Sequence, residues 1–302
     1  MTYASSVTGA ISARPVLPRI ARRASAFAAL LILAAGFSGC SKLKARDLLN
    51  KGVAAFKGGQ YDTAIEDFKQ AKDLDPGLMN ARLYLATAYA SQYIPGAPSE
   101  QNIRLGTQAV NEFKEVLEVD PNNLSAIDGI GSIIFQMAGT PYDPKKFEES
   151  KSYHKRHIDL KPNDPEPYYW IGVIDWTLAF RTNGELRAEY NRGNIKKQVK
   201  DTDPLPSAVR AQYAEKYGAL VDEGIAELQK AIQLRPDYDD AMAYLNLLYR
   251  ERADLHCGDP EGRQADIKLA DEMVEKTMAT KRMKAEKANE QHGIVLDQPN
   301  KP

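Results

Sequence analysis

Four segments of this chain end in the same way, with an aliphatic residue, a charged residue and a proline. Each follows a stretch with helical periodicity. Proline stops a helix because it lacks the backbone N–H group and pushes the preceding residue out of the α region. Such a recurrence is typical of a solenoid, whose repeats bury their apolar faces only against their neighbours. The four endings are Leu74-Asp75-Pro76, Val119-Asp120-Pro121, Leu160-Lys161-Pro162 and Leu234-Arg235-Pro236.

The first repeat, residues 45–78, carries its pattern in full. Small residues stand at positions 8, 20 and 27 of this 34-residue unit, and a phenylalanine stands at position 24. Small residues let two helices approach closely, and the aromatic ring fills the space behind them. This pattern resembles the tetratricopeptide repeat, a hairpin of two helices. The matching positions are Leu48, Gly52, Ala64, Phe68, Ala71 and Pro76.

The resemblance implies an all-α fold, a right-handed superhelical solenoid of about five tetratricopeptide hairpins with insertions. The repeat domain is expected to span residues 45–290, and residues 291–302, with two prolines, are predicted to be a disordered tail. The longest insertion runs from about residue 177 to residue 216. Its middle, residues 181–200, has six basic and two acidic residues. We interpret the insertion as a solvated, partly helical loop, or as a docking arm for an acidic partner or anionic headgroups.

The N-terminal segment, residues 1–39, contains four arginines and no acidic residue, and ends in an apolar run and small residues. The run is too short to span a bilayer permanently, and it is typical of a secretion signal. Small residues directly before Cys40 resemble the bacterial lipoprotein signal peptide. The resemblance implies that residues 1–39 are removed, that Cys40 is acylated and that residues 40–44 form a lipidated linker. The alternative is an ordinary signal peptide that leaves Cys40 as a free thiol.

The lipoprotein signal implies a location in the bacterial cell envelope, with palmitate-type acyl chains holding the protein on a membrane. Ser41 and Lys42 follow the cysteine where inner-membrane lipoproteins of enteric bacteria carry aspartate, which favours the outer membrane and a protein that faces the periplasm. Removal of the four arginines would change the formal net charge from −1 to −5. A nucleic-acid partner requires a basic face, so this charge argues against one.

Catalytic motifs are absent from the sequence. We find no phosphate-binding glycine loop and no nucleophile elbow, and adjacent carboxylates such as Glu148 and Glu149 diverge around a helix. We therefore expect a protein that is not an enzyme and that needs no cofactor or metal. The alternative is a metal- or redox-responsive sensor that uses His154, His157 and Cys257. Both histidines, however, stand at repeat positions 24 and 27, where packing residues belong.

The resemblance also implies a binding groove, because tetratricopeptide units place their first helix on the concave side of the solenoid. The family's groove positions, carried over unit by unit, give a mixed surface with four aromatic rings. Aromatic side chains are common in interface hot spots. In the alternative, the insertions cover these rings. The predicted groove residues are Leu49, Val53, Phe56, Leu83, Phe135, Gln136, Tyr169, Val173, Trp176, Leu247 and Arg250.

The chemistry of this groove indicates its partners. Leu49 and Val53 stand where the carboxylate-clamp type of groove has lysine and asparagine, so we expect extended or apolar peptide segments of envelope proteins. The sequence therefore predicts a membrane-anchored, periplasmic scaffold or adaptor. By analogy of architecture and anchor, it would serve barrel assembly, pilus biogenesis or a protease. The alternative function is an accessory to a cell-envelope enzyme that uses residues 177–216 as a substrate domain.

Overall fold

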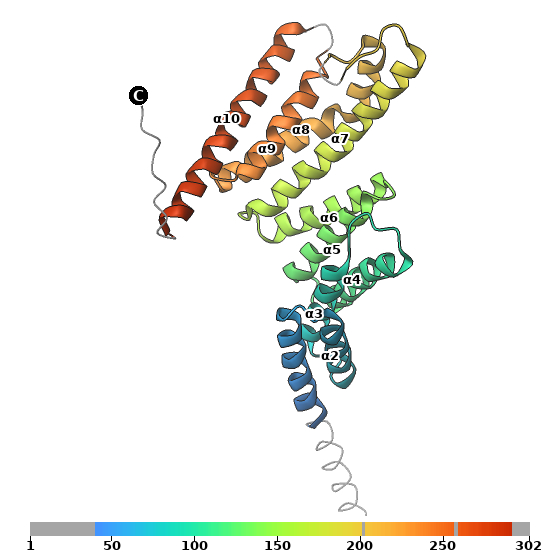
Figure 1. Cartoon of the computed structure of the whole chain (residues 1–302), viewed down its shortest axis with the longest axis vertical. Coiled ribbons are helices and arrows are strands. Elements are labelled where there is room, and N and C mark those ends of the chain that lie inside the picture. Colours follow the sequence, from blue (N-terminus) through green and yellow to red (C-terminus); the bar gives the residue numbers. More distant parts are fainter. Residues whose placement is uncertain (1–39, 201–202, 257–258, 292–302) are drawn as a thin grey trace, which may run out of the picture. The chain divides into compact units, whose positions relative to one another are not determined.

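The regular structure of this chain is helical (Figure 1). The computed structural model describes residues 40–200, 203–256 and 259–291, and within them one isolated bridge, between Gly139 and Tyr142, is the only β pairing. A first helix covers residues 40–57. The helices that follow are α2 (Tyr61–Leu74), α3 (Met79–Gln92), α4 (Glu100–Val119), α5 (Leu124–Ala138), α6 (Pro144–Leu160), α7 (Pro165–Gly193), α8 (Ser207–Leu234), α9 (Asp239–Ala253) and α10 (Pro260–Gln291).

The helices form hairpins that follow one another along the chain. Neighbouring helices contact each other from α4 to α10, and α7 also contacts α9. The first helix with α2, and the pairs α3–α4, α5–α6, α7–α8 and α9–α10, give five hairpins in the described part of the chain. The prediction of an all-α solenoid of about five hairpins is confirmed.

The chain divides into two units after Ala81. In the first unit, Leu48, Ala71 and Ala81 are buried together. A Cβ atom at Gly52 would lie 2.5 Å from the ring of Phe68, so this position requires glycine for the helices to approach closely. The structure therefore bears out the packing that the spacing of the first repeat predicts.

The four prolines follow helices that end with the same geometry. The residue before each proline donates its backbone N–H group to the carbonyl four residues earlier, as Arg235 does to Ala231 at 2.9 Å. The residue three positions after this cap then donates back to the cap's carbonyl, as Tyr238 does to Arg235 at 3.0 Å. Because the same bonds recur after α2, α4 and α6, each following helix starts in the same way.

The core of the second unit, which begins at Arg82, is largest where α7, α8 and α9 meet. Leu228, Leu245 and Leu248 are buried there. A Cβ atom at Gly172 would lie 2.3 Å from Cγ of Leu228, so α7 and α8 are as close as a glycine allows. Because this packing prevents α7 from rotating about its axis, the same side chains of α7 always face α9.

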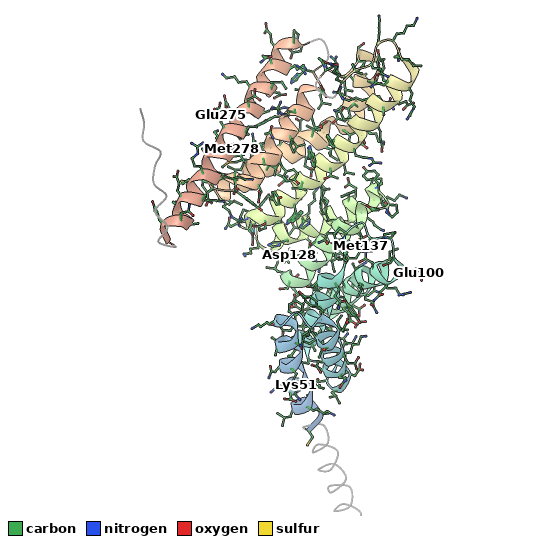
Figure 2. All side chains as sticks on the ribbon, in the orientation of Figure 1. Lys51, Glu100, Asp128, Met137, Glu275 and Met278 are labelled. Atoms are coloured by element: carbon green, nitrogen blue, oxygen red, sulfur yellow. The ribbon has the colours of Figure 1, made fainter. Side chains whose placement is uncertain are left out.

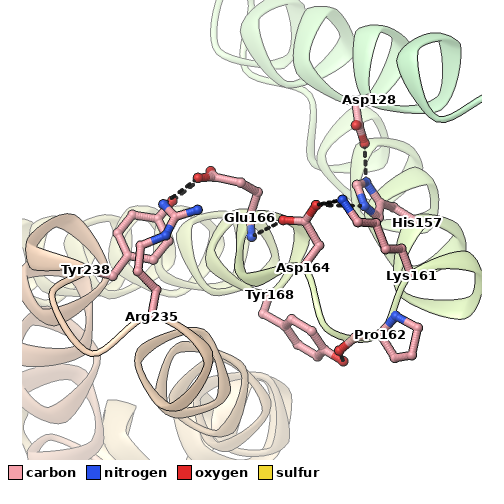
Figure 3. Close-up of polar contacts among 9 residues, drawn as sticks. All are labelled: Asp128, His157, Lys161, Pro162, Asp164, Glu166, Tyr168, Arg235 and Tyr238. Atoms are coloured by element: carbon pink, nitrogen blue, oxygen red, sulfur yellow. Dashed lines mark hydrogen bonds and ion pairs between the residues drawn. The ribbon is translucent and has the colours of Figure 1, made fainter.

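Polar contacts hold the start of α7 against its neighbours (Figure 3). Asp164 caps α7 by accepting from the backbone N–H group of Glu166 at 3.2 Å, and it also accepts from Lys161 at 2.8 Å. The carboxylate of Glu166 accepts from Arg235 and from the hydroxyl of Tyr238, both at 2.7 Å. Since Arg235 and Tyr238 belong to the turn before α9, these bonds fix α9 beside α7.

The insertion predicted at about 177–216 is mostly helix. Helix α7 continues to Gly193 and α8 begins at Ser207, so residues 194–206 alone connect them. Residues 40–44, predicted to be a linker, belong to the first helix. The predicted signal peptide, Cys257 and the predicted tail from residue 292 onward lie outside the described residues. Among the helices of the described ranges, none combines the length and the apolar character needed to cross a membrane.

Candidate functional site

A pocket of about 380 Å³ opens between α7, α9 and α10 in the second unit. Its volume lies within the range of small-ligand and side-chain pockets. One wall is apolar, the floor is polar, and two arginines stand at the rim. The lining residues are Trp176, Phe180, Asn183, Gly184, Arg187, Leu247, Arg250, Glu251, Asp254, Arg263 and Ile267.

Stacked aromatic rings form the apolar wall. The rings of Trp176 and Phe180 lie 5.0 Å apart and nearly parallel, and Tyr244 meets Trp176 edge-on at 5.2 Å. The spacing follows from the helix, because residues four apart stand on the same face of α7. Phe180 is 55 % exposed, so one face of its ring is open to solvent. This wall can therefore receive an apolar side chain of a partner.

The floor of the pocket is a network of buried polar groups. Asn183 donates to Glu251 at 2.8 Å and to Asp254 at 3.1 Å, and its own oxygen accepts from Arg187 at 2.7 Å. Arg187 also donates to Asp254 at 2.6 Å, and the hydroxyl of Tyr213 donates to Glu251 at 2.7 Å. A network in which the buried groups have partners is rigid and specifies one arrangement. The floor thus holds α7 and α9 at a fixed separation.

The charges around this floor are mixed. Burial raises the pKa of Glu251, although hydrogen bonds from Tyr213 and Asn183 oppose the rise. At the rim, Arg250 donates to Asp271 at 2.8 Å. The Nε atom of Arg263 is buried and has no hydrogen-bond partner among the described residues.

The acidic side chains that line this pocket are engaged by neighbouring side chains. Within the described ranges, the lining includes no serine, cysteine, histidine or lysine. The two carboxylates, Glu251 and Asp254, are both held by hydrogen bonds from neighbouring side chains. The arrangement can bind a peptide through an apolar side chain and its backbone oxygens.

Three of the predicted groove residues meet in this pocket: Trp176, Leu247 and Arg250. Tyr169 lies next to it, because its ring contacts Tyr244 at 5.8 Å. Val173 was predicted to face a partner, and this prediction is wrong. The side chain is 2 % exposed, because it points into the core.

The other predicted residues lie elsewhere. Phe135 is half-buried and contacts the ring of Trp170 at 5.4 Å. Gln136 lines a separate, shallow pocket of about 310 Å³ between α3, α4 and α5, and Leu83 is half-buried on α3. Leu49, Val53 and Phe56 belong to the first helix and are half-buried there.

Several residues of the site escaped prediction. Phe180, Asn183 and Arg187 were assigned to an insertion outside the repeat pattern, yet they continue α7. The helical spacing of Ala179, Asn183 and Leu186, all buried, is the signal that could have revealed the longer helix. Arg263 and Ile267 come from α10.

The two histidines of the sensor alternative are packed into the solenoid. His154 is buried and stacks on Trp170 at 6.0 Å. His157 bonds to Asp128 through Nδ1 at 2.6 Å (Figure 3). Among the described residues no group of histidine, cysteine and acidic side chains could hold a metal ion. Cys40, the predicted lipidation site, is a free and exposed cysteine.

Comparison with known proteins agrees with this fold. The family model for the tetratricopeptide repeat matches residues 45–78. A crystal structure of MamA aligns with a TM-score of 0.52 over 86 % of this chain and 98 % of that protein, at 16 % identity. MamA from Desulfovibrio magneticus RS-1 aligns with a TM-score of 0.51 over 80 % of this chain and 96 % of that chain, at 17 % identity. No curated protein sequence matches this chain.

Proposed function

Because this chain is a tetratricopeptide-repeat solenoid, we propose that it is a scaffold that captures an extended peptide segment in the pocket between α7, α9 and α10. The observation that carries this proposal is the exposed Phe180, stacked on Trp176 at the mouth of a pocket with a rigid polar floor. An apolar side chain of the peptide would lie against the rings. The backbone carbonyls of the peptide would accept from Arg250 at the rim. Interface hot spots combine aromatic and arginine side chains in this way.

The pocket also limits what the partner can be. Its apolar wall and its mixture of arginines with acidic residues fit a peptide that carries an apolar anchor and little net charge. A purely acidic segment would meet Glu251 and Asp254 on the floor. We therefore expect specificity to depend mainly on the apolar anchor, with hydrogen bonds to the rim setting the direction of the peptide.

Selection of a displayed library of unstructured peptides on the full-length protein tests the pocket. A selected peptide should bind Phe180→Ala at least about tenfold more weakly than wild type in fluorescence anisotropy, as expected for a hot-spot ring. The matched control is Ile103→Ala on α4, since Ile103 is 50 % exposed and lines none of the pockets described above. Equal losses in the two variants, or none, would show that binding does not use the pocket.

Arginine at the rim gives a second, independent comparison. Arg250→Ala should weaken the same peptide, because the guanidinium group would be lost from the pocket mouth. Arg104→Ala on α4 is its control: Arg104 also pairs with a carboxylate on its own surface, Glu100 at 3.4 Å. If both substitutions weaken binding equally, charge alone attracts the peptide and the pocket has no part in it.

The proposed scaffold is held in the bacterial cell envelope by acyl chains on Cys40, facing the periplasm from the outer membrane. The resemblance of the preceding residues to a lipoprotein signal supports this proposal, and the exposed thiol is accessible to modification. Mass spectrometry of the N-terminal peptide should detect a diacylglyceryl group on Cys40 of the wild type. Cys40→Ser should lose that mass and leave the membrane fraction. An unmodified Cys40 in the native membrane would overturn the anchor.

The role in an envelope assembly can be tested in intact cells. A photoreactive phenylalanine analogue at position 180 should crosslink to envelope proteins through their extended segments. The same analogue at position 103 is the control for contacts made by proximity alone. Crosslinks that appear at both positions, or at neither, would argue against a scaffold that uses this pocket.

A further inference from the structure

A second surface of the extended hairpin has unusual chemistry. Residues 190–200, which we name the basic tip, join the end of α7 to the connection before α8. The basic tip holds four basic residues and no acidic one. All four charged side chains are exposed, and Ile195 between them is 80 % exposed. The basic side chains are Arg192, Lys196, Lys197 and Lys200.

The exposure of Ile195 is a fixed feature, because hydrogen bonds hold the basic tip in shape. The side chain of Asn191 accepts from the backbone of Val199 at 2.8 Å and donates back to it at 2.9 Å. The backbone N–H group of Lys197 donates to Asn194 at 2.9 Å. Arg187, in the floor of the pocket, donates to the carbonyl of Lys200 at 2.8 Å. The loop is thus closed at its base, with Ile195 outside.

Charge distinguishes Ile195 from the exposed Met278 of α10. Met278 on α10 is also exposed, but Glu275 stands one helical turn before it and lysines follow (Figure 2). Such a mixed surface is ordinary solvated helix. At the basic tip, by contrast, two lysines follow the exposed aliphatic side chain directly. The acidic residues Glu189, Asp201 and Asp203 stand outside this segment in the sequence, and Asp203 accepts from the backbone N–H group of Lys200 at 2.9 Å. An exposed aliphatic side chain beside lysines is typical of segments that lie at the interface of an anionic membrane.

We propose that the basic tip docks on a membrane surface that carries anionic lipid headgroups. Lysine and arginine side chains pair with the headgroups, and Ile195 enters the layer between headgroups and acyl chains. An acidic protein surface is the competing partner. The tip fits it less well, because three of its four basic residues are lysines, which protein interfaces disfavour. A lone aliphatic side chain also makes no interface core. The proposal rests neither on the peptide pocket nor on Cys40.

An environment-sensitive fluorophore placed beside Ile195 tests the contact directly. The full-length chain would carry Cys40→Ser and Cys257→Ser, with one new cysteine at Gly193→Cys labelled with nitrobenzoxadiazole. Gly193 is exposed, and a side chain there meets no atom within 4 Å. Vesicles of phosphatidylcholine with phosphatidylglycerol should shift the emission to the blue. Vesicles of phosphatidylcholine alone should not, because they lack the anionic headgroups.

Two substitutions and one matched probe position separate docking from simple proximity. Each basic residue near an anionic surface contributes about fivefold to affinity, so Lys196→Ala with Lys197→Ala should raise the half-maximal lipid concentration about 25-fold. Ile195→Asp should raise it at least about tenfold. A probe at Gly184→Cys, also in open space and about 14 Å earlier along α7, should not shift.

Four results would overturn the proposal. No shift at position 193 would show that the basic tip does not reach the bilayer. An equal shift on neutral vesicles, or an equal shift at position 184, would show adsorption without headgroup recognition. A shift unchanged by all the substitutions at Ile195, Lys196 and Lys197 would show that other residues hold the protein there.

Discussion

Replacing His154 by leucine should remove an acid-sensitive point from the third hairpin. His154 is 3 % exposed, lies against Gly131 and stacks on Trp170. Its Nε2 atom is buried without a hydrogen-bond partner among the described residues. In the fourth hairpin, the equivalent position is held by Leu228. A leucine should therefore fit the site, and it removes a buried polar atom that contributes nothing.

The expected size follows from the pKa of His154. Burial lowers it from 6.5 to about 4, with a smaller effect from His157. Below pH 6.5 the unfolded chain binds a proton that the folded chain refuses, so stability is full above this pH and falls as the pH falls toward 4. The loss attributable to His154 is about 1.4 kcal/mol near pH 5.5 and about 2.6 kcal/mol near pH 4.5.

Urea unfolding followed by circular dichroism, at several pH values from neutral to acid, measures this loss. The wild type should lose stability relative to His154→Leu by the amounts above, because the carboxylates that titrate in the same range are common to both proteins. Nuclear magnetic resonance of the imidazole protons should also show that His154 titrates well below 6.5. Parallel stability curves for the two proteins, or an ordinary pKa for His154, would refute the reasoning.

Two further predictions concern packing and buried charge. Gly172→Ala should lower the unfolding free energy by about 1–3 kcal/mol, because its Cβ would meet Leu228. Gly184→Ala on the open side of α7 should instead raise the unfolding free energy by up to about 1 kcal/mol. Equal effects of the two substitutions in urea unfolding would contradict this prediction. Lys151→Met should cost about 3 kcal/mol or more, because it strands the carboxylate of Asp175, which is fully buried and 2.6 Å from Lys151. Adding Asp175→Asn should recover most of that loss, as measured by thermal unfolding of the single and double variants. Melting temperatures equal to that of the wild type in both variants would contradict this prediction.

The sequence predicts the local features of this fold well, because short-range physics decides them. Proline ends a helix wherever it stands, so four prolines reveal four helix ends. The pairing of Gly52 with Phe68 follows from the spacing within one hairpin, and no distant residue can alter it. Five hairpins follow from these two rules together with the length of the chain.

These short-range rules do not predict the contacts between hairpins. Asn183 and Glu251 are 68 residues apart, and their hydrogen bond depends on where α7 ends and how α9 crosses it. At the first of these points, the sequence predicted an insertion after Trp176 in the form of a partly helical loop, and in the structure these residues continue α7 to Gly193. Val173 was misplaced for a related reason. Groove positions carried over from a short hairpin take no account of a longer helix that packs more of its surface.

The extension of the fourth hairpin links the two proposed surfaces. Four of the eleven residues that line the pocket belong to α7 beyond Trp176, and the same helix ends in the basic tip. Arg187 joins them physically, because its guanidinium bonds to Asp254 in the pocket floor and to the carbonyl of Lys200 in the tip. A variant whose fourth hairpin is shortened to the ordinary repeat length would lose both surfaces at once. It could not show which surface binds the peptide and which contacts the membrane. Phe180→Ala and Ile195→Asp can, because each changes one surface and leaves the bonds of Arg187 in place. If either substitution impairs both peptide capture and membrane contact, the two surfaces are coupled through that arginine, and Arg187→Gln should then impair both as well.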